Sequence, residues 1–314
     1  MRQTNVLNAN PTSPNHALQR TAPCVTTPAS AAAFPPTMQV PRRPPQSLSL
    51  RSLDGKTRRP MLLDTIHGII DRRILLNYHI EPDALQQVLP PGFRPKLFRG
   101  KGIGGVCMIR FRELRPRKIP AWLGLRSENA AHRIAVEWEQ DDGTREGVFI
   151  PRRDTNSTLN KVLGGRVFPG IFDKGSFVSD EAGDEIALTI RRKDGSKEAH
   201  FKGRVGHALP DTSLFDTVEQ AASFFSLGAT GYSATREEGH YHGMELRSLD
   251  WSIDPMEIED AHTSFFSDRI RFPEGSVELD CALVMRGIEH EWHSRPDLYY
   301  NPRKEHLSTR RPTV

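Results

Sequence analysis

The sequence predicts an α+β fold in which antiparallel β-strands dominate and a few helices pack on the sheet. From Asp64 onward, short runs of alternating apolar and polar residues are separated by Gly, Pro, Asn and Asp, a pattern typical of half-buried strands joined by turns. Asp-Gly pairs lie between some of these runs, which favours hairpins. Helical spacing occurs only in a few short segments, so strands are expected to form most of the structure.

The first elements follow one another closely. Residues 72–80 (RRILLNYHI) predict a strand, and a helix is expected to begin at Pro82, with leucines four apart on one face. The Pro-Pro-Gly run at 90–92 ends this helix, because proline cannot continue it. Residues 93–111 then predict a hairpin, with its turn at the glycine-containing stretch 99–102.

Further strand pairs and helices complete the region. Strands are expected at 133–140 with 145–151 around Asp141-Asp142-Gly143, and at 185–193 with 199–205 around Lys193-Asp194-Gly195. Helices are expected at 157–165 and 213–228, each ending at glycine, and the segment 288–296 predicts a last strand at the edge of the sheet.

The two ends of the chain differ in composition from the middle. Residues 1–60 hold ten of the 24 prolines, carry a net charge of +7 and have few large apolar residues, which predicts a disordered extension. An organellar transit peptide is an alternative that the prolines disfavour, and a translation start at Met61 is another. Residues 301–314, with a net charge of +3, are expected to form a disordered basic tail.

Residues 61–300 are expected to form one domain, because no repeat or linker-like stretch interrupts them. Their net charge is −6, so the overall charge of +4 comes from the two ends. An acidic domain repels a polyanion on average, and we expect no nucleic-acid binding by the folded part. An interaction module whose basic ends contact nucleic acid or an anionic surface is a separate hypothesis.

Cysteine content and hydropathy indicate a cytoplasmic protein. Cys24, Cys107 and Cys281 form no C-x-x-C pair and are too few for a disulfide framework. Cys107 and Cys281 lie within apolar runs and are expected to be buried, unreactive thiols. No apolar run approaches the roughly 18 residues of a membrane-spanning helix, so no membrane association is expected.

Two histidine clusters raise the question of a metal site. His240 and His242, with Glu245 nearby, offer an H-x-H pair that shares one face of a strand, and residues 290–293 offer H-E-x-H. The first cluster follows Glu237-Glu238-Gly239 and is expected at an exposed hairpin tip. The second lacks the helical spacing of a metalloprotease. We therefore expect no metal.

One family pattern is visible in the order of these segments. The stretch LLNYHIEPDALQQVLPPGFRPKLFRGKGIGGVCMIRF, followed by SENAAHRIAVEW, VFIPRRDTNSTLNKVLGGRVFPGIF and FFSLGATGYSA, resembles the YqjF-like branch of the acetoacetate decarboxylase superfamily. The resemblance covers most of residues 70–295. It implies a curved, mostly antiparallel sheet that forms a cone-shaped barrel with an interior pocket.

The resemblance also implies candidate site residues. The decarboxylase motif G-R-E-I-W-G-F-P-K-K, placed on residues 165–174, puts its second lysine at Lys174 and its nucleophilic lysine at Asp173. A neighbouring anion favours the ammonium form of Lys174, which cannot attack a carbonyl. Schiff-base decarboxylation by the known mechanism is therefore not expected from this pair.

Other charged residues match polar positions of the same family. Glu128 lies near the position of a pocket glutamate, so the resemblance implies Glu128 and Lys174 as the catalytic candidates. Arg166, Asp173 and Arg133 are the candidates for ligand binding. We expect a small-molecule pocket protein without Schiff-base activity, whose ligand is a carboxylate or carbonyl compound and which needs no cofactor. The alternative is an enzyme of the superfamily that acts on a keto acid or a similar compound.

Overall fold

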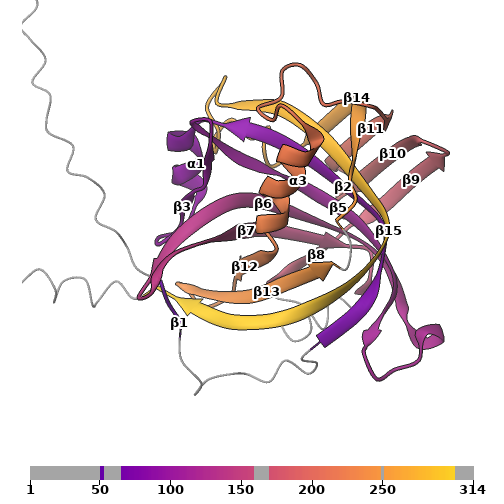
Figure 1. Cartoon of the computed structure of the whole chain (residues 1–314), viewed down its shortest axis with the longest axis horizontal. Helices are drawn as coiled ribbons and strands as arrows, with labels where there is room; N and C mark the ends of the chain where they lie inside the picture. The colour runs from indigo at the N-terminus through magenta and orange to yellow at the C-terminus, as the bar shows by residue number, and fades with distance from the viewer. Residues whose placement is uncertain (1–49, 53–64, 159–169, 249–250, 301–314) are drawn as a thin grey trace, which may run out of the picture. The chain divides into compact units, whose positions relative to one another are not determined.

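The computed structural model describes residues 50–52, 65–158, 170–248 and 251–300. The expectations for the N-terminal extension, the C-terminal tail and most of the helix at 157–165 fall outside these residues. Figure 1 shows a strongly curved sheet with two short helices against it. No helix in the described ranges is long and apolar enough to cross a membrane.

The strands are β1 (Arg51–Ser52), β2 (Thr65–Ile80), β3 (Arg94–Pro95), β4 (Leu97–Phe98), β5 (Lys101–Pro116), β6 (Leu125–Gln140), β7 (Gly143–Thr155), β8 (Phe172–Lys174), β9 (Ser176–Ala182), β10 (Glu185–Arg191), β11 (Lys197–Val205), β12 (Thr230–Ala234), β13 (His240–Ser248), β14 (Asp254–Thr263) and β15 (Val277–Tyr299). The helices are α1 (Pro82–Val88) and α3 (Val218–Leu227), with a 3-10 turn η1 (Ala121–Leu123).

The sheet closes on itself. Its strands follow the order β13-β12-β7-β6-β5-β2-β15, and β13 pairs again with β15, which completes a ring. From β15 the sheet continues outward through β14, β11, β10 and β9. The pairs are antiparallel except β7 with β12 and β7 with β8. The prediction of a mostly antiparallel, curved and barrel-like sheet is confirmed.

The expected hairpins form where the turn residues predicted them. Arg99 and Gly100 both have positive φ, 49° and 80°, the backbone of a two-residue turn whose twist matches the strands on either side. β6 and β7 meet at Gly143, and β10 and β11 meet around Gly195, each with positive φ. Asp-Gly and Arg-Gly pairs thus set the strand register in these hairpins.

Two apolar clusters lie on the two sides of the sheet, because successive strand residues point to opposite faces. Leu75, Cys107 and Ile109 belong to the cluster that includes Phe225 of α3, and we call this side the cavity face. Ile74 and Met108 belong to the other cluster, on what we call the opposite face. Both faces are therefore buried over much of the sheet.

The helices agree with the sequence in position. Pro82 opens α1, and the Thr217 side chain accepts a hydrogen bond from the backbone N–H of Gln220 and so caps α3. The expected helix begins at residue 213, whereas α3 begins at Val218, and Asp216, just before the cap, forms an ion pair with Arg99. Figure 1 shows α3 lying across the curved sheet.

Two predictions about the last strands are wrong. The segment 288–296 is not an edge strand, because β15 pairs with β2 along one side and with β13 and β14 along the other. His240 is buried, although the turn before it at 236–238 is exposed. Ring closure explains both differences, since β13 and β15 each gain a partner that sequence spacing does not show.

Candidate functional site

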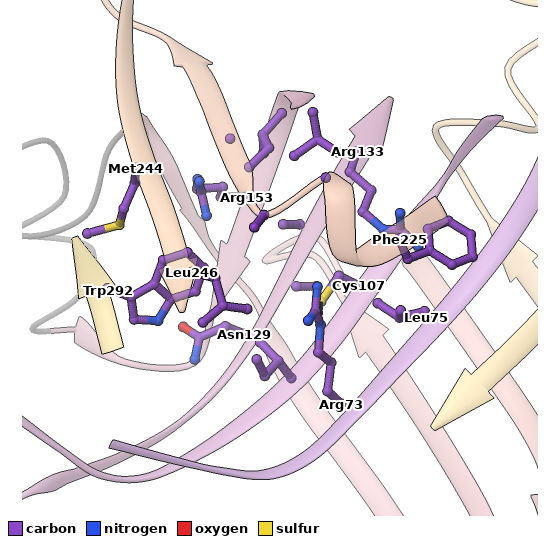
Figure 2. A pocket seen from close by; sticks show the side chains of 18 of the residues that line it. Arg73, Leu75, Cys107, Asn129, Arg133, Arg153, Phe225, Met244, Leu246 and Trp292 are labelled. Atoms are coloured by element: carbon purple, nitrogen blue, oxygen red, sulfur yellow. Dashed lines mark hydrogen bonds between the residues drawn. The ribbon is translucent and has the colours of Figure 1, made fainter. Parts of the chain in front are cut away.

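A cavity of about 90 Å³ lies on the cavity face. Its walls come from β2, β5, β6, β7, β8, β12, β13, β15 and α3, so every strand of the ring contributes to it (Figure 2). The lining is mostly apolar and includes Leu75, Ile109, Phe111, Phe172, Phe225 and Trp292. An apolar cavity with few polar groups is the usual form of a small-molecule site.

Strand alternation and register place the polar side chains in this cavity. Leu75, Cys107, Ala131 and Arg153 lie opposite one another in successive strands, so their side chains share the cavity face. Arg73 is two residues from Leu75 on β2, and the same period brings its side chain to the same wall. Arg73 and Arg153 therefore occupy strand positions that normally hold apolar core residues.

Gly105 allows a contact across β5. Asn77, Gly105 and Arg133 are opposite one another in β2, β5 and β6, and a side chain at position 105 would meet the Leu76 carbonyl oxygen at 2.2 Å. Because glycine leaves this space empty, the Arg133 guanidinium reaches over it and donates a hydrogen bond to Asn77 Oδ1. Arg133 also lies 4.7 Å from the centre of the Phe225 ring, a cation–π contact with α3.

The other two arginines have equally weak partners. Arg73 donates from Nε to Cys107 Sγ at 3.2 Å, and its guanidinium lies 5.4 Å from the ring centre of Trp251. Arg153 donates from Nε to Ser233 Oγ at 3.3 Å and lies 5.6 Å from the ring centre of Phe172. Among the described residues, no carboxylate forms an ion pair with Arg73, Arg133 or Arg153.

The cavity therefore concentrates positive charge in an apolar setting. Burial lowers the pKa of Arg133 to about 10 and that of Arg153 to about 10, so both stay protonated at neutral pH. Charges removed from water without an opposite charge are costly. A negative charge placed among the three guanidinium groups would offset this cost.

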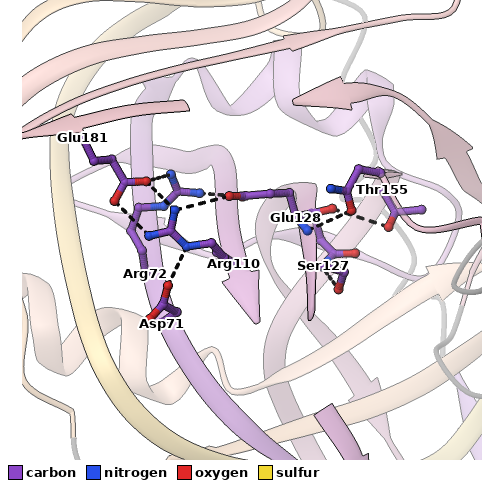
Figure 3. A network of polar contacts seen from close by, with 9 residues as sticks. Asp71, Arg72, Arg110, Ser127, Glu128, Thr155 and Glu181 are labelled. Atoms are coloured by element: carbon purple, nitrogen blue, oxygen red, sulfur yellow. Dashed lines mark hydrogen bonds and ion pairs between the residues drawn. The ribbon is translucent and has the colours of Figure 1, made fainter. Parts of the chain in front are cut away.

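Glu128, one of the two catalytic candidates, lies on the opposite face. Its carboxylate accepts a hydrogen bond from Arg72 at 2.6 Å, and Arg72 also pairs with Glu181 at 2.9 Å (Figure 3). Arg110 joins Glu181 to Asp71 in the same network. Burial raises the pKa of Glu128, and the charges of Arg72 and Arg110 only partly oppose that shift. Glu128 thus belongs to a network that is already paired.

Lys174 and Asp173 lie outside the cavity, in a separate polar depression. Both belong to β8 and line a wide polar depression of about 940 Å³, together with Arg152 and Arg192. Lys174 Nζ donates to Thr158 Oγ1 at 2.6 Å, and Asp173 lies 3.5 Å from Arg152. No ion pair joins Lys174 to Asp173 in the described part of the chain. Neither residue lines the cavity that holds Arg73, Arg133 and Arg153, which we call the arginine cavity.

The structure thus brings only one of the predicted residues into the cavity. Arg133 lines it, whereas Glu128, Asp173 and Lys174 do not, and Arg166 lies outside the described residues. Sequence reasoning missed Arg73 and Arg153. The sequence does indicate the position of Arg73, because Arg73 lies two residues before Leu75 and therefore on the same, apolar face of its strand.

The two cysteines in the described part of the chain differ in surroundings. Cys281 is fully buried, and burial raises the pKa of its thiol far above the usual range. Cys107 is also mostly buried, but its sulfur lines the cavity and accepts the hydrogen bond from Arg73. The expectation of a buried thiol holds for both residues, and only Cys107 reaches the candidate site.

Ring topology and cavity define a protein of the acetoacetate decarboxylase-like fold. Residues 70–284 match the model of DUF2071, an uncharacterized conserved protein, and the chain belongs to that family. No curated protein matches the sequence.

One solved structure supports the fold, and two others are similar with lower scores. An acetoacetate decarboxylase from Legionella pneumophila is similar with a TM-score of 0.50 at 12% identity, over 76% of this chain and 89% of that one. An acetoacetate decarboxylase-like enzyme from Sphingomonas wittichii RW1 has a TM-score of 0.49 at 13% identity, over 82% of this chain and 100% of the other. The enduracididine biosynthesis enzyme MppR, complexed with pyruvate, has a TM-score of 0.47 at 12% identity, over 74% and 88% of the two chains.

Proposed function

We propose that this protein binds a small organic carboxylate in the arginine cavity of its ring. The observation that carries the proposal is the set of three guanidinium groups that face the cavity without an ion-pair partner among the described residues. A carboxylate would supply the missing negative charge. Guanidinium is well suited to this role, because its planar N–H groups match the two carboxylate oxygens.

The size and lining of the cavity narrow the class of ligand. Its volume of about 90 Å³ is below the roughly 150 Å³ of a cavity that holds benzene. Short-chain carboxylates and keto acids fit this size, and the aromatic and aliphatic lining would contact their carbon chains. The same lining excludes water from the ion pairs, which strengthens them.

Binding without a Schiff base is the form of this function that the geometry favours. No lysine is among the described residues that line the cavity. Lys174 points to the other depression, where it bonds to Thr158. A keto acid held by the arginines would therefore lack a neighbouring amine to form an imine.

Ligand-observed NMR with matched pairs of small molecules tests the proposal. Butyrate and acetoacetate are expected to give saturation-transfer signals, and butyramide, which has nearly the same shape without the charge, is not. Arg133→Met and Arg153→Met should each weaken the signal, whereas Lys174→Ala should leave it unchanged. Equal binding of butyrate and butyramide, or of butyrate to wild type and both arginine variants, contradicts a carboxylate site.

Borohydride reduction separates binding from imine chemistry. The wild-type chain is incubated with acetoacetate, reduced and digested, and the lysine-containing peptides are examined by mass spectrometry. We expect no reduced adduct on any lysine of the full chain. An adduct on one lysine, formed only with acetoacetate present, would favour the enzyme hypothesis.

A further inference from the structure

A second cluster of ligand-type side chains lies where β13 meets β15. His240 Nε2 is 2.9 Å from Asp297 Oδ2, and His242 Nδ1 is 3.2 Å from Asp297 Oδ1. Ligand atoms of all three residues lie within 4.8 Å of one another. Two imidazole nitrogens and a carboxylate oxygen thus converge from two strands.

The fold aims these side chains by alternation and by a bulge. His240 and His242 are two residues apart on β13 and share a face. The register between β13 and β15 shifts between Tyr241 and Gly243, so that Pro296 and Asp297 together lie opposite the single residue His242. The extra residue is a β-bulge, which locally redirects side chains, and a proline is tolerated there.

Neighbouring groups hold His240 in a suitable orientation. Its ring stacks on Tyr299 at 4.3 Å, and its Nδ1 lies 3.3 Å from Glu237 Oε2. A carboxylate at one imidazole nitrogen keeps the proton there and leaves the other nitrogen as a metal ligand. Here that other nitrogen, Nε2, is the one that faces Asp297.

The charge balance also favours a cation. Among the described residues, Asp297 has no arginine or lysine partner, in contrast to Asp154 and Glu198 elsewhere, which Arg152 and Arg192 already neutralise.

From this geometry we propose that His240, His242 and Asp297 bind one Zn²⁺ ion. Two nitrogen ligands and one carboxylate oxygen suit zinc, whereas Ca²⁺ and Mg²⁺ prefer oxygen ligands alone. Three protein ligands leave a fourth position open for water or a small anion. The His240 side chain is nearly buried, at 11% exposed, and those of His242 and Asp297, at 19% and 23%, give an ion access from solvent.

The site lies next to the arginine cavity. Ser233, which accepts the hydrogen bond from Arg153, is the register partner of His242 on the neighbouring strand. Met244, two residues beyond His242, lines the cavity. The proposal does not depend on carboxylate binding there, since its ligands and its test are separate.

Metal titration of the full chain, prepared without a histidine tag, tests the inference. Calorimetry with Zn²⁺ is expected to show one site per chain, and Co²⁺ should give the visible absorption bands of a site with low coordination number. His242→Ala and Asp297→Asn should each weaken Zn²⁺ binding by more than about tenfold, and Glu237→Gln by about tenfold, the range for residues that orient a ligand. Glu245→Gln is the matched control, because Glu245 points away and pairs with Arg247 and Arg295.

Paramagnetic Co²⁺ locates the site in the wild-type chain without any substitution. NMR signals of Tyr299 and Ser233 are expected to broaden first. Absence of one-to-one binding, equal affinity in the His242→Ala variant, or broadening centred on other residues would each overturn the proposal.

Discussion

Two pairs of adjacent arginines show that guanidinium groups have different partners on the two faces of the sheet. Arg72 and Arg152 lie on the opposite face and are paired with carboxylates, Arg72 with Glu128 and Glu181 and Arg152 with Asp154 and Glu198. Their sequence neighbours Arg73 and Arg153 lie on the cavity face and contact sulfur, hydroxyl and aromatic groups instead. One residue along a strand thus separates a neutralised guanidinium from one with no counter-charge in the described structure.

This difference in partners indicates different roles for the arginines on the two faces. Paired arginines on the opposite face join β2, β5 and β6 to β9 through Glu181, and so connect the ring to the outer strands (Figure 3). Among the described residues, Arg73, Arg133 and Arg153 form no ion pair that joins the ring to the outer strands. The removal of their charges from water opposes folding. Under the proposed function, a bound carboxylate would offset that cost on the cavity face, whereas the charges on the opposite face are already offset by their ion pairs.

The largest effect is expected from breaking the paired side. Arg72 is 1% exposed, and Arg72→Ala would leave the Glu128 carboxylate, whose side chain is 12% exposed, without its nearest cation. Removing one partner of a buried ion pair typically costs about 3–5 kcal/mol. Urea unfolding should therefore show a loss of this order in the free energy of unfolding.

Arg73→Met is the matched control on the neighbouring residue. It removes a guanidinium whose partners are uncharged, so its effect on the free energy of unfolding should be much smaller than that of Arg72→Ala. Similar losses in the two variants would show that the faces do not differ in the way their contacts suggest.

The opposite face should also control stability in acid. His132 is fully buried, and burial with the nearby Arg152, Arg192 and Arg271 lowers its pKa from 6.5 to about 3. As pH falls below 6.5, the unfolded chain takes up a proton that folded His132 cannot accept, so unfolding becomes easier. Between pH 7 and pH 5 this loss is about 2 kcal/mol.

His132→Leu isolates that contribution. The variant should show a weaker fall in the free energy of unfolding over this pH range than wild type, as measured by urea unfolding at each pH. His290, whose pKa burial also lowers to about 3, titrates in both chains and cancels in the comparison. An identical pH dependence in the two chains would show that His132 is accessible to protons in the folded state.

On the cavity face, Arg133→Met is expected to separate stability from binding. The charge it removes has no carboxylate partner among the described residues, and Met fills apolar space well. The free energy of unfolding should stay within about 1 kcal/mol of wild type, because the lost bond to Asn77 is offset by relief of desolvation. Butyrate binding should fall at the same time, and a variant that loses both equally would show Arg133 to be structural.

The sequence predicted the fold better than the site, for a physical reason. Turn residues such as Gly100 and Gly143 and the alternation of apolar residues act locally, so hairpins and strands follow from them directly. The closure of β13 onto β15 is a contact between distant elements, and no local pattern reports it. His240 was therefore expected in solvent but is buried in the ring.

The site depends on which face each charge takes. Glu128 and Arg133 lie five residues apart on β6, an odd spacing that sends them to opposite faces, so they cannot act in one pocket. The alternation of side chains along a strand could have placed Arg73 on the cavity face, because Arg73 lies two residues from Leu75. Motif alignment instead favoured Lys174 and Asp173, whose strand β8 carries them to the polar depression.

The smallest effect is expected from Lys174, and it sharpens the comparison because Lys174 lines the polar depression with Arg152 and lies outside the arginine cavity. Its side chain is exposed, and within the described residues its hydrogen-bond partner is Thr158. Lys174→Ala should change the free energy of unfolding by less than about 0.5 kcal/mol, as for other surface substitutions. Butyrate binding measured by saturation transfer should also be unchanged, since the arginine cavity does not include this residue. If Lys174→Ala abolishes binding while Arg133→Met does not, the ligand lies in the polar depression with Arg152 and Arg192, and the role assigned to the unpaired arginines is wrong.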